Sequence, residues 1–262
     1  MIRFRAAAIA VTASLALIGA AAQPADAGPM TPNRGRYAAL GDSYAAGVGN
    51  QPLKNAGVSL RSAAAYPVLL ADQVNKVTFL AVSGATTGTV SAHQVPQIPR
   101  SVTQVTLTAG GNDVGFGMIA MACTSPDAAT QCGPAVAAAQ ARLPQMTADL
   151  AALIQQVQDQ APRAEIYVTG YPILFQCGPH PVLGTVDAAN QQLNHAIRAV
   201  ALAQGATYVD VTDEFAGHGL CQGPNSWILP AGSVAPLHPT ARGQQAYADA
   251  IEATAFTSAA ES

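Results

Sequence analysis

The chain has 262 residues, of which 50% are hydrophobic and 10% are charged, and its formal net charge is −3. This length predicts a single domain with a sizeable hydrophobic core. No cluster of basic residues occurs along the chain, which argues against nucleic acid as a partner.

The N-terminal segment has the pattern of a secretory signal peptide. Arg3 and Arg5 precede an uncharged, alanine-rich run at 6–22, and Ala25-Asp26-Ala27 fits a cleavage site. A membrane anchor is the alternative, because the run is of borderline length for a transmembrane span, but the cleavage site favours removal. We therefore expect a secreted protein without a membrane anchor, divided into a signal peptide at 1–27, a flexible tail at 28–35 and one domain at 36–262.

From residue 36 onward, runs suited to buried strands alternate with stretches of helical periodicity. Strands are predicted at 36–40, 77–82, 103–109, 164–169 and 206–211. Helices are predicted at 63–75, 140–160, 187–204 and 240–256. This alternation predicts an α/β domain in which helices cover both faces of a parallel sheet. All four cysteines fall in the Pro- and Gly-rich loops expected at 113–139, 171–186 and 212–237.

The run Gly41-Asp42-Ser43-Tyr44 follows the first predicted strand. Ser43 is therefore expected on a turn from strand to helix, at the strand end where ligands bind in open α/β sheets. A hydroxyl there can serve as a nucleophile if a neighbouring base takes its proton. The alternative is that Ser43 caps the helix. The run lacks the Gly-x-Ser-x-Gly pattern, so it does not match the nucleophile elbow of α/β-hydrolases.

The run Gly110-Gly111-Asn112-Asp113 follows the third predicted strand, which is rich in β-branched residues. The two glycines allow a tight backbone path beside a bound group. Asn112 can then aim its side-chain amide into the crevice as a donor to an oxyanion. The alternative is a plain Gly-Asn turn without a catalytic role.

His238 lies in the run Pro236-Leu237-His238-Pro239, just before the last predicted helix. Histidine is the side chain best suited to act as a base near neutral pH. The alternative is a surface histidine in a loop. His195 is expected on the solvated face of a helix and His218 in a structural role. No comparable context surrounds any of the other four histidines, which are His93, His180, His195 and His218.

Together these runs resemble the SGNH, or GDSL, hydrolase family, and most closely its secreted actinobacterial lipases and esterases. The resemblance extends over about Tyr37 to Ile251 and includes a further block, Ala81-Val82-Ser83-Gly84-Ala85-Thr86-Thr87. It implies a flavodoxin-like three-layer α/β/α sandwich with a five-stranded parallel sheet.

The resemblance also implies a role for each matching residue. Ser43 would be the nucleophile, and His238 would be the general base and acid. The oxyanion hole would consist of the backbone N–H groups of Ser43 and Gly84 and the side-chain amide of Asn112. Neither a metal nor a cofactor is implied.

The chain departs from the family pattern near its histidine. Many members carry an aspartate three residues before the histidine, where it orients the imidazole, and Ala235 occupies that position here. The actinobacterial branch implies a Ser-His dyad, in which the main-chain carbonyl of Pro236 accepts from the Nδ1–H of His238. The alternative is that Asp213 or Glu214 folds back to the imidazole.

Four cysteines, an even number, suit an exported protein. They permit three disulfide connectivities, among which the sequence alone does not choose. The resemblance favours the pairs Cys123–Cys132 and Cys177–Cys221, each clamping a long loop beside the crevice.

The implied activity is that of a secreted serine esterase or lipase that hydrolyses carboxylic (acyl) esters through an acyl-enzyme. A phospholipase or a carbohydrate acetylesterase with the same site, or a non-catalytic secreted binding domain, are the alternatives. We expect a monomer that acts on a small-molecule or lipid ester. Some apolar loop residues are expected to line an acyl groove and at least half to pack the loops instead; they are Phe116, Met118, Ile119, Leu174, Phe175, Trp227, Ile228 and Leu229.

Overall fold

The computed structural model describes residues 35–55 and 59–255. The expected signal peptide at 1–27 and nearly all of the tail at 28–35 lie outside the described residues, so both stay predictions. Within the described ranges, no helix combines the length and the apolar character that a membrane span requires.

Five parallel strands form the central sheet, in the spatial order β4-β1-β5-β6-β7. They are β1 (Arg36–Gly41), β4 (Lys76–Phe79), β5 (Gln104–Thr108), β6 (Glu165–Thr169) and β7 (Thr207–Val209). In the middle of the sheet β1 pairs with β5, with Leu40 opposite Leu107. These inner strands are buried over most of their length, and β1 is apolar from Tyr37 to Leu40, whereas β5 alternates apolar residues with threonines. The predicted five-stranded parallel sheet is confirmed, although β4 and β7 end two or three residues earlier than expected.

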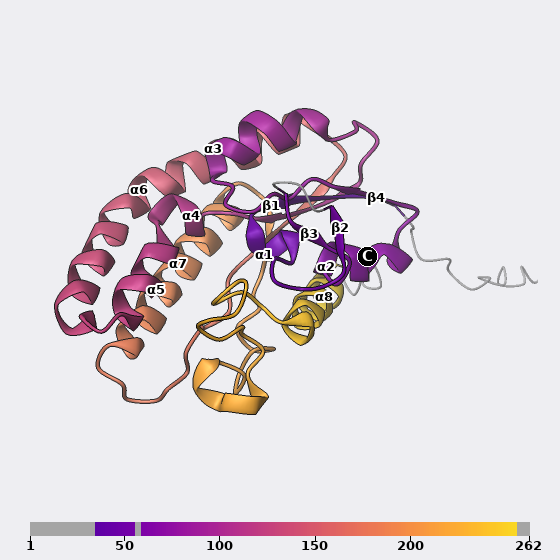
Figure 1. Cartoon of the computed structure of the whole chain (residues 1–262). Helices are drawn as coiled ribbons and strands as arrows, with labels where there is room; N and C mark the ends of the chain where they lie inside the picture. The colour runs from indigo at the N-terminus through magenta and orange to yellow at the C-terminus, as the bar shows by residue number, and fades with distance from the viewer. Residues whose placement is uncertain (1–34, 56–58, 256–262) are drawn as a thin grey trace, which may run out of the picture. The chain divides into compact units, whose positions relative to one another are not determined.

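Helices cover both faces of this sheet, as predicted. On one side α6 (Ala128–Gln160) and α7 (Leu183–Ala203) lie next to each other, together with the short α3 (Thr87–Thr89) (Figure 1). On the other side lie α2 (Tyr66–Leu69) and α8 (Ala241–Ala255), joined by the stacked rings of Tyr66 and Tyr247, whose centroids are 5.5 Å apart. The domain is therefore a three-layer α/β/α sandwich.

Shorter elements complete the chain. A 3₁₀ turn at Leu70–Gln73 continues α2, so the helix expected at 63–75 is broken in two. After α3 the chain continues through a π-helical turn at Val90–Gln94 and a 3₁₀ turn at Val95–Gln97, which the sequence pattern did not indicate. The remaining elements are α1 (Ser43–Ala46), the antiparallel pair β2 (Leu53–Asn55) and β3 (Arg61–Ser62), and a 3₁₀ turn at Leu220–Asn225.

The loop predicted at 113–139 is wrong, because this region is mainly helical. α4 (Gly111–Val114) and α5 (Phe116–Thr124) precede α6, which begins at Ala128 instead of residue 140. Gly133 and Pro134 lie inside α6, in the part expected as a Pro- and Gly-rich loop, whereas Pro144 lies in the part that was predicted as helix. The segment stays helical because its alanines favour a helix and because packing of one face offsets the local cost of proline. The loop expected at 171–186 also ends early, since α7 begins at Leu183.

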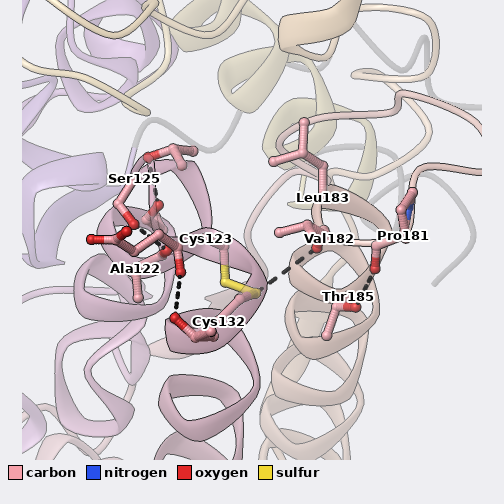
Figure 2. Close-up of a disulfide and its surroundings, with 12 residues drawn as sticks. Ala122, Cys123, Ser125, Cys132, Pro181, Val182, Leu183 and Thr185 are labelled. Atoms are coloured by element: carbon pink, nitrogen blue, oxygen red, sulfur yellow. Dashed lines mark hydrogen bonds between the residues drawn. A yellow bond between two sulfur atoms is a disulfide. The ribbon is translucent and has the colours of Figure 1, made fainter.

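Both expected disulfides are present, Cys123–Cys132 and Cys177–Cys221. The first does not clamp a loop as expected. It joins the end of α5 to the first turns of α6, and the Sγ atom of Cys132 lies 4.0 Å from the carbonyl oxygen of Val182, just before α7 (Figure 2). The second joins the loop after β6 to the 3₁₀ turn at Leu220–Asn225.

The two disulfides should contribute unequally to stability. They close segments with sequence separations of 9 and 44 residues. Loop-entropy estimates give about 3 kcal/mol for the shorter and about 4 kcal/mol for the longer. We expect the double variant Cys177→Ser/Cys221→Ser to lower the free energy of unfolding more than Cys123→Ser/Cys132→Ser, as measured by urea unfolding. The opposite order would show that native packing around α5, rather than chain entropy, dominates.

Candidate active site

Ser43 lies on a tight turn at the carboxyl end of β1. Gly41 has φ +138°, and a Cβ atom there would lie 2.3 Å from the carbonyl oxygen of Thr108 on β5, so only glycine fits. The next residue, Asp42, donates its backbone N–H to that carbonyl at 3.0 Å. Asp42 is also the N-cap of α1, since its Oδ1 accepts from the N–H of Tyr44 at 2.9 Å. The cap is thus Asp42 and not Ser43, which leaves the serine hydroxyl for another partner.

That partner is the imidazole of His238. Its Nε2 lies 2.8 Å from the Oγ of Ser43, and its Nδ1 lies 2.9 Å from the carbonyl oxygen of Pro236. A carbonyl only accepts hydrogen bonds, so the Nδ1 atom must carry the proton. In the neutral ring, Nε2 is then free to accept from the serine hydroxyl.

Burial governs the protonation of this imidazole. Desolvation lowers the pKa of His238 from its ordinary value of 6.5, and the hydrogen bonds with Pro236 and Ala235 oppose that shift. The neutral form, which can accept a proton from Ser43, is therefore favoured at pH 7.

Asp213 and Glu214 are the alternative candidates for orienting the imidazole of His238. Neither Asp213 nor Glu214 makes a hydrogen bond with the ring in the described part of the chain. One carboxylate oxygen of Glu214 is buried without a partner, and burial raises the pKa of this group.

Asn112 lies at the start of α4, directly after β5. Its Nδ2 donates one hydrogen to the carbonyl oxygen of Ala85 at 2.9 Å, and the second amide hydrogen remains for a ligand. This bond ties the turn around Gly84 to the turn after β5. Asp113 strengthens the tie, because its carboxylate accepts from the backbone N–H of Thr87 at 3.1 Å and from its hydroxyl at 2.5 Å.

Gly84 has φ +76° and is exposed, and a Cβ atom there would meet nothing within 4 Å. Its conformation, rather than a crowded surrounding, therefore favours glycine. Ser43 is the first residue of α1, and its backbone N–H has no intrahelical acceptor.

A buried hydrogen-bond network, which the sequence did not predict, connects the turn after β1 with the turn after β5. The hydroxyl of Tyr171, which follows β6, donates to Oδ2 of Asp42 at 2.6 Å and accepts from the N–H of Gly111 at 3.1 Å. Burial raises the pKa of Asp42 to about 6, although the hydrogen bond with Tyr171 lowers it in part. No local sequence signal connects Asp42 with Tyr171, because they lie far apart in the chain. The one available signal was the position of Asp42 directly before Ser43.

An apolar cavity of about 510 Å³ opens beside this cluster. Ser43, Asn112 and His238 lie on its wall, and apolar side chains provide much of the remainder: Phe116, Met118, Met121, Leu174 and Leu193. Three of the eight residues expected in an acyl groove thus line the cavity. Ile119, Phe175 and Ile228 are buried in the core instead, and Trp227 and Leu229 pack against it.

The other histidines lie apart from this cavity. His195 is exposed on α7. His218 stacks on Trp227 with ring centroids 3.6 Å apart, and its Nδ1 lies 2.8 Å from the carbonyl oxygen of Asn225, which is a structural arrangement. Over the described ranges, no group of three or more His, Cys, Asp or Glu residues is placed to hold a metal ion.

A serine hydroxyl bonded to an imidazole, at the carboxyl edge of a parallel sheet and beside an apolar cavity, is typical of serine hydrolases with an α/β/α fold. Comparison with known proteins agrees with that class. Residues 39–246 match the GDSL-like Lipase/Acylhydrolase family. The chain belongs to this family and is a carboxylic ester hydrolase.

Relatives from Streptomyces resemble the chain over most of its length. A lipase of Streptomyces rimosus is 34% identical over 253 residues, which cover 91% of this chain and 92% of the lipase. The crystal structure of an extracellular lipase from the same organism has 31% identity and a TM-score of 0.77, and covers 84% of this chain and 99% of that one. Phospholipase A1 from Streptomyces albidoflavus has 32% identity and a TM-score of 0.78, and covers 85% of this chain and 100% of that one.

The lowered pKa of His238 can be measured directly. In an NMR titration, we expect the Cε1–H resonance of His238, assigned through its absence in His238→Ala, to titrate with a midpoint below 6.5, because burial disfavours the charged ring. The same resonance in the urea-unfolded protein should titrate near the ordinary value of about 6.5. A folded midpoint above the unfolded one would mean that the hydrogen bond with Pro236 outweighs desolvation.

Proposed function

We propose that this protein is a secreted serine esterase or lipase that cleaves acyl esters with a Ser43–His238 dyad. The observation that carries the proposal is the 2.8 Å contact of His238 Nε2 with Ser43 Oγ at the wall of an apolar cavity. Secretion is supported by the signal-peptide pattern at 1–27 and by the resemblance to an extracellular lipase.

In the acylation step, Ser43 Oγ attacks the ester carbonyl carbon while Nε2 of His238 takes the hydroxyl proton. The carbonyl oxygen becomes an oxyanion, which the backbone N–H groups of Ser43 and Gly84 and the free amide hydrogen of Asn112 stabilise. The imidazolium then gives its proton to the departing alkoxide oxygen, and the alcohol leaves. The products of this step are the alcohol and an acyl ester on Ser43.

In the deacylation step, His238 takes a proton from water, and the hydroxide oxygen attacks the acyl carbon. The second tetrahedral intermediate breaks to release the carboxylic acid, and the proton returns to Ser43 Oγ. The carbonyl of Pro236 keeps Nδ1 protonated throughout. Because this acceptor is neutral, it stabilises the imidazolium less than a carboxylate would.

The apolar wall of the cavity suits the hydrocarbon part of an acyl ester. A phospholipase is the second candidate, and the resemblance to phospholipase A1 from Streptomyces albidoflavus favours it specifically. Both candidates use the same chemistry and differ only in the alcohol that leaves.

The variant Ser43→Ala tests the nucleophile. It should abolish hydrolysis of p-nitrophenyl esters and labelling by a fluorophosphonate probe, because no other hydroxyl replaces the attacking oxygen. Ser91→Ala is a matched control, since its hydroxyl bonds Gln156 outside the site, and it should retain activity and labelling. Undiminished labelling of Ser43→Ala would remove Ser43 from the mechanism.

The same assay extends to the alternatives. A series of ester chain lengths beside phospholipid and acetylated-sugar substrates separates a lipase from a phospholipase or an acetylesterase. Background activity of the wild-type chain on all of them would favour a non-catalytic binding domain.

The dyad is tested by removing carboxylates. Asp213→Asn and Glu214→Gln should each keep most of kcat, because the acceptor at Nδ1 is the Pro236 carbonyl. His238→Ala should be nearly as damaging as Ser43→Ala, because the base and the nucleophile act as a unit. A triad that depends on aspartate loses about 10⁴-fold in kcat when that aspartate becomes asparagine. A loss of that size in Asp213→Asn or Glu214→Gln would show that a carboxylate orients the ring.

A further inference from the structure

The residue before His238 has an unfavourable backbone conformation. Leu237 has φ +66°, a left-handed value that non-glycine residues rarely adopt. Such a conformation persists only where surrounding contacts hold it. The contacts that hold Leu237 therefore bear on the geometry of the neighbouring imidazole.

The two torsions of Leu237 set the position of the Pro236 carbonyl relative to the backbone N and Cα atoms of His238. The acceptor oxygen belongs to the peptide plane between residues 236 and 237, and the backbone of His238 begins in the plane between residues 237 and 238. Since peptide units are planar, φ and ψ of Leu237 are the only soft backbone torsions between these two planes. If either plane rotates, the carbonyl no longer points at Nδ1.

A separate hydrogen bond fixes each plane. The N–H of Leu237, in the first plane, donates to the carbonyl oxygen of Leu229 at 2.9 Å. The carbonyl of Leu237, in the second plane, accepts from the hydroxyl of Tyr44 at 2.6 Å. The N–H of the second plane makes only a longer contact, 3.4 Å to the carbonyl oxygen of Ala235. Tyr44 therefore makes the shorter of the two hydrogen bonds to the second plane.

Several contacts fix the position of Tyr44 itself. Its ring packs edge-on against Tyr171 and Tyr247, with centroid distances of 5.1 and 6.4 Å, and its backbone carbonyl accepts from Nε2 of Gln244 at 3.0 Å. The same ring lies 5.2 Å from that of His238. Burial raises the pKa of the Tyr44 phenol, so its hydroxyl stays protonated and remains a donor.

We propose that Tyr44 is a positioning residue, whose hydroxyl holds Leu237 in its left-handed conformation and so aims the Pro236 carbonyl at Nδ1 of His238. This inference rests on the proposed dyad. A carboxylate on a flexible side chain can follow the ring with either oxygen. A main-chain carbonyl points only where its peptide plane directs it, so a dyad of this kind needs the plane to be held.

The variant Tyr44→Phe removes the hydroxyl and keeps the ring. We expect kcat to fall about 10–100-fold, because small errors in the position of a catalytic group are costly, while KM changes by no more than about twofold. The matched control is Tyr37→Phe, which removes a buried hydroxyl bonded to Thr106 at 2.6 Å, inside the sheet and outside the active-site cavity. This control should keep the wild-type kcat.

Two further measurements separate positioning from a general loss of structure. The Nδ1–H proton of His238 should give a downfield NMR resonance in the wild type and in Tyr37→Phe, and this resonance should move upfield or exchange away in Tyr44→Phe. The second is a double-mutant cycle with Leu237→Asn, because asparagine tolerates the left-handed conformation better than leucine. Tyr44→Phe should cost several-fold less kcat in the Leu237→Asn background than in the wild type.

The outcomes distinguish this inference from the proposed function. If Ser43→Ala and His238→Ala abolish activity while Tyr44→Phe keeps the wild-type kcat and resonance, the positioning role is overturned and the dyad stands. Strictly additive losses in the cycle, or a lowered kcat with an unchanged Nδ1–H resonance, would also overturn it. If Ser43→Ala stays active, the dyad itself fails.

Discussion

The close approach of two strand ends governs the rest of this site. At the carboxyl edge of the sheet, Gly41 on β1 passes so near the Thr108 carbonyl on β5 that a side chain has no room. The chain can therefore turn sharply after β1, and the N–H of Asp42 closes the turn onto the same carbonyl. Asn112 follows β5 closely, so this contact brings the turn that carries Ser43 and the turn that carries Asn112 to the same cavity.

A buried hydroxyl extends this arrangement to a third strand. Tyr171 leaves β6 and bonds both Asp42 after β1 and Gly111 after β5. One buried phenol thus joins three neighbouring strand ends. Burying an aspartate carries an electrostatic cost, visible in its raised pKa of about 6, and its hydrogen bonds with Tyr171 and Tyr44 offset part of that cost.

Local sequence chemistry predicted the strand-end turns, because each depends on residues close together in the chain. The pairing of Pro236 with His238 was implied by the family resemblance. The parallel sheet was predictable from the order of the elements, because alternating strands and helices are compatible with few topologies. The helical course of 113–139 was not, because Gly133 and Pro134 indicate a loop while tertiary packing decides the outcome. The bond between Asp42 and Tyr171 spans 129 residues, and no periodicity records such a pairing.

Ser43 and His238, the two residues of the proposed dyad, are held in place by different contacts. Ser43 is anchored to the central sheet, whereas His238 arrives on the last loop, where Leu229 bonds both Leu237 and His238. Tyr44 connects these two segments, because it follows Ser43 directly and its hydroxyl donates to the carbonyl of Leu237, the residue before His238. The 2.8 Å contact between His238 Nε2 and Ser43 Oγ and the hydrogen bond from Tyr44 to Leu237 therefore connect the same two segments, so the position of one segment constrains the position of the other.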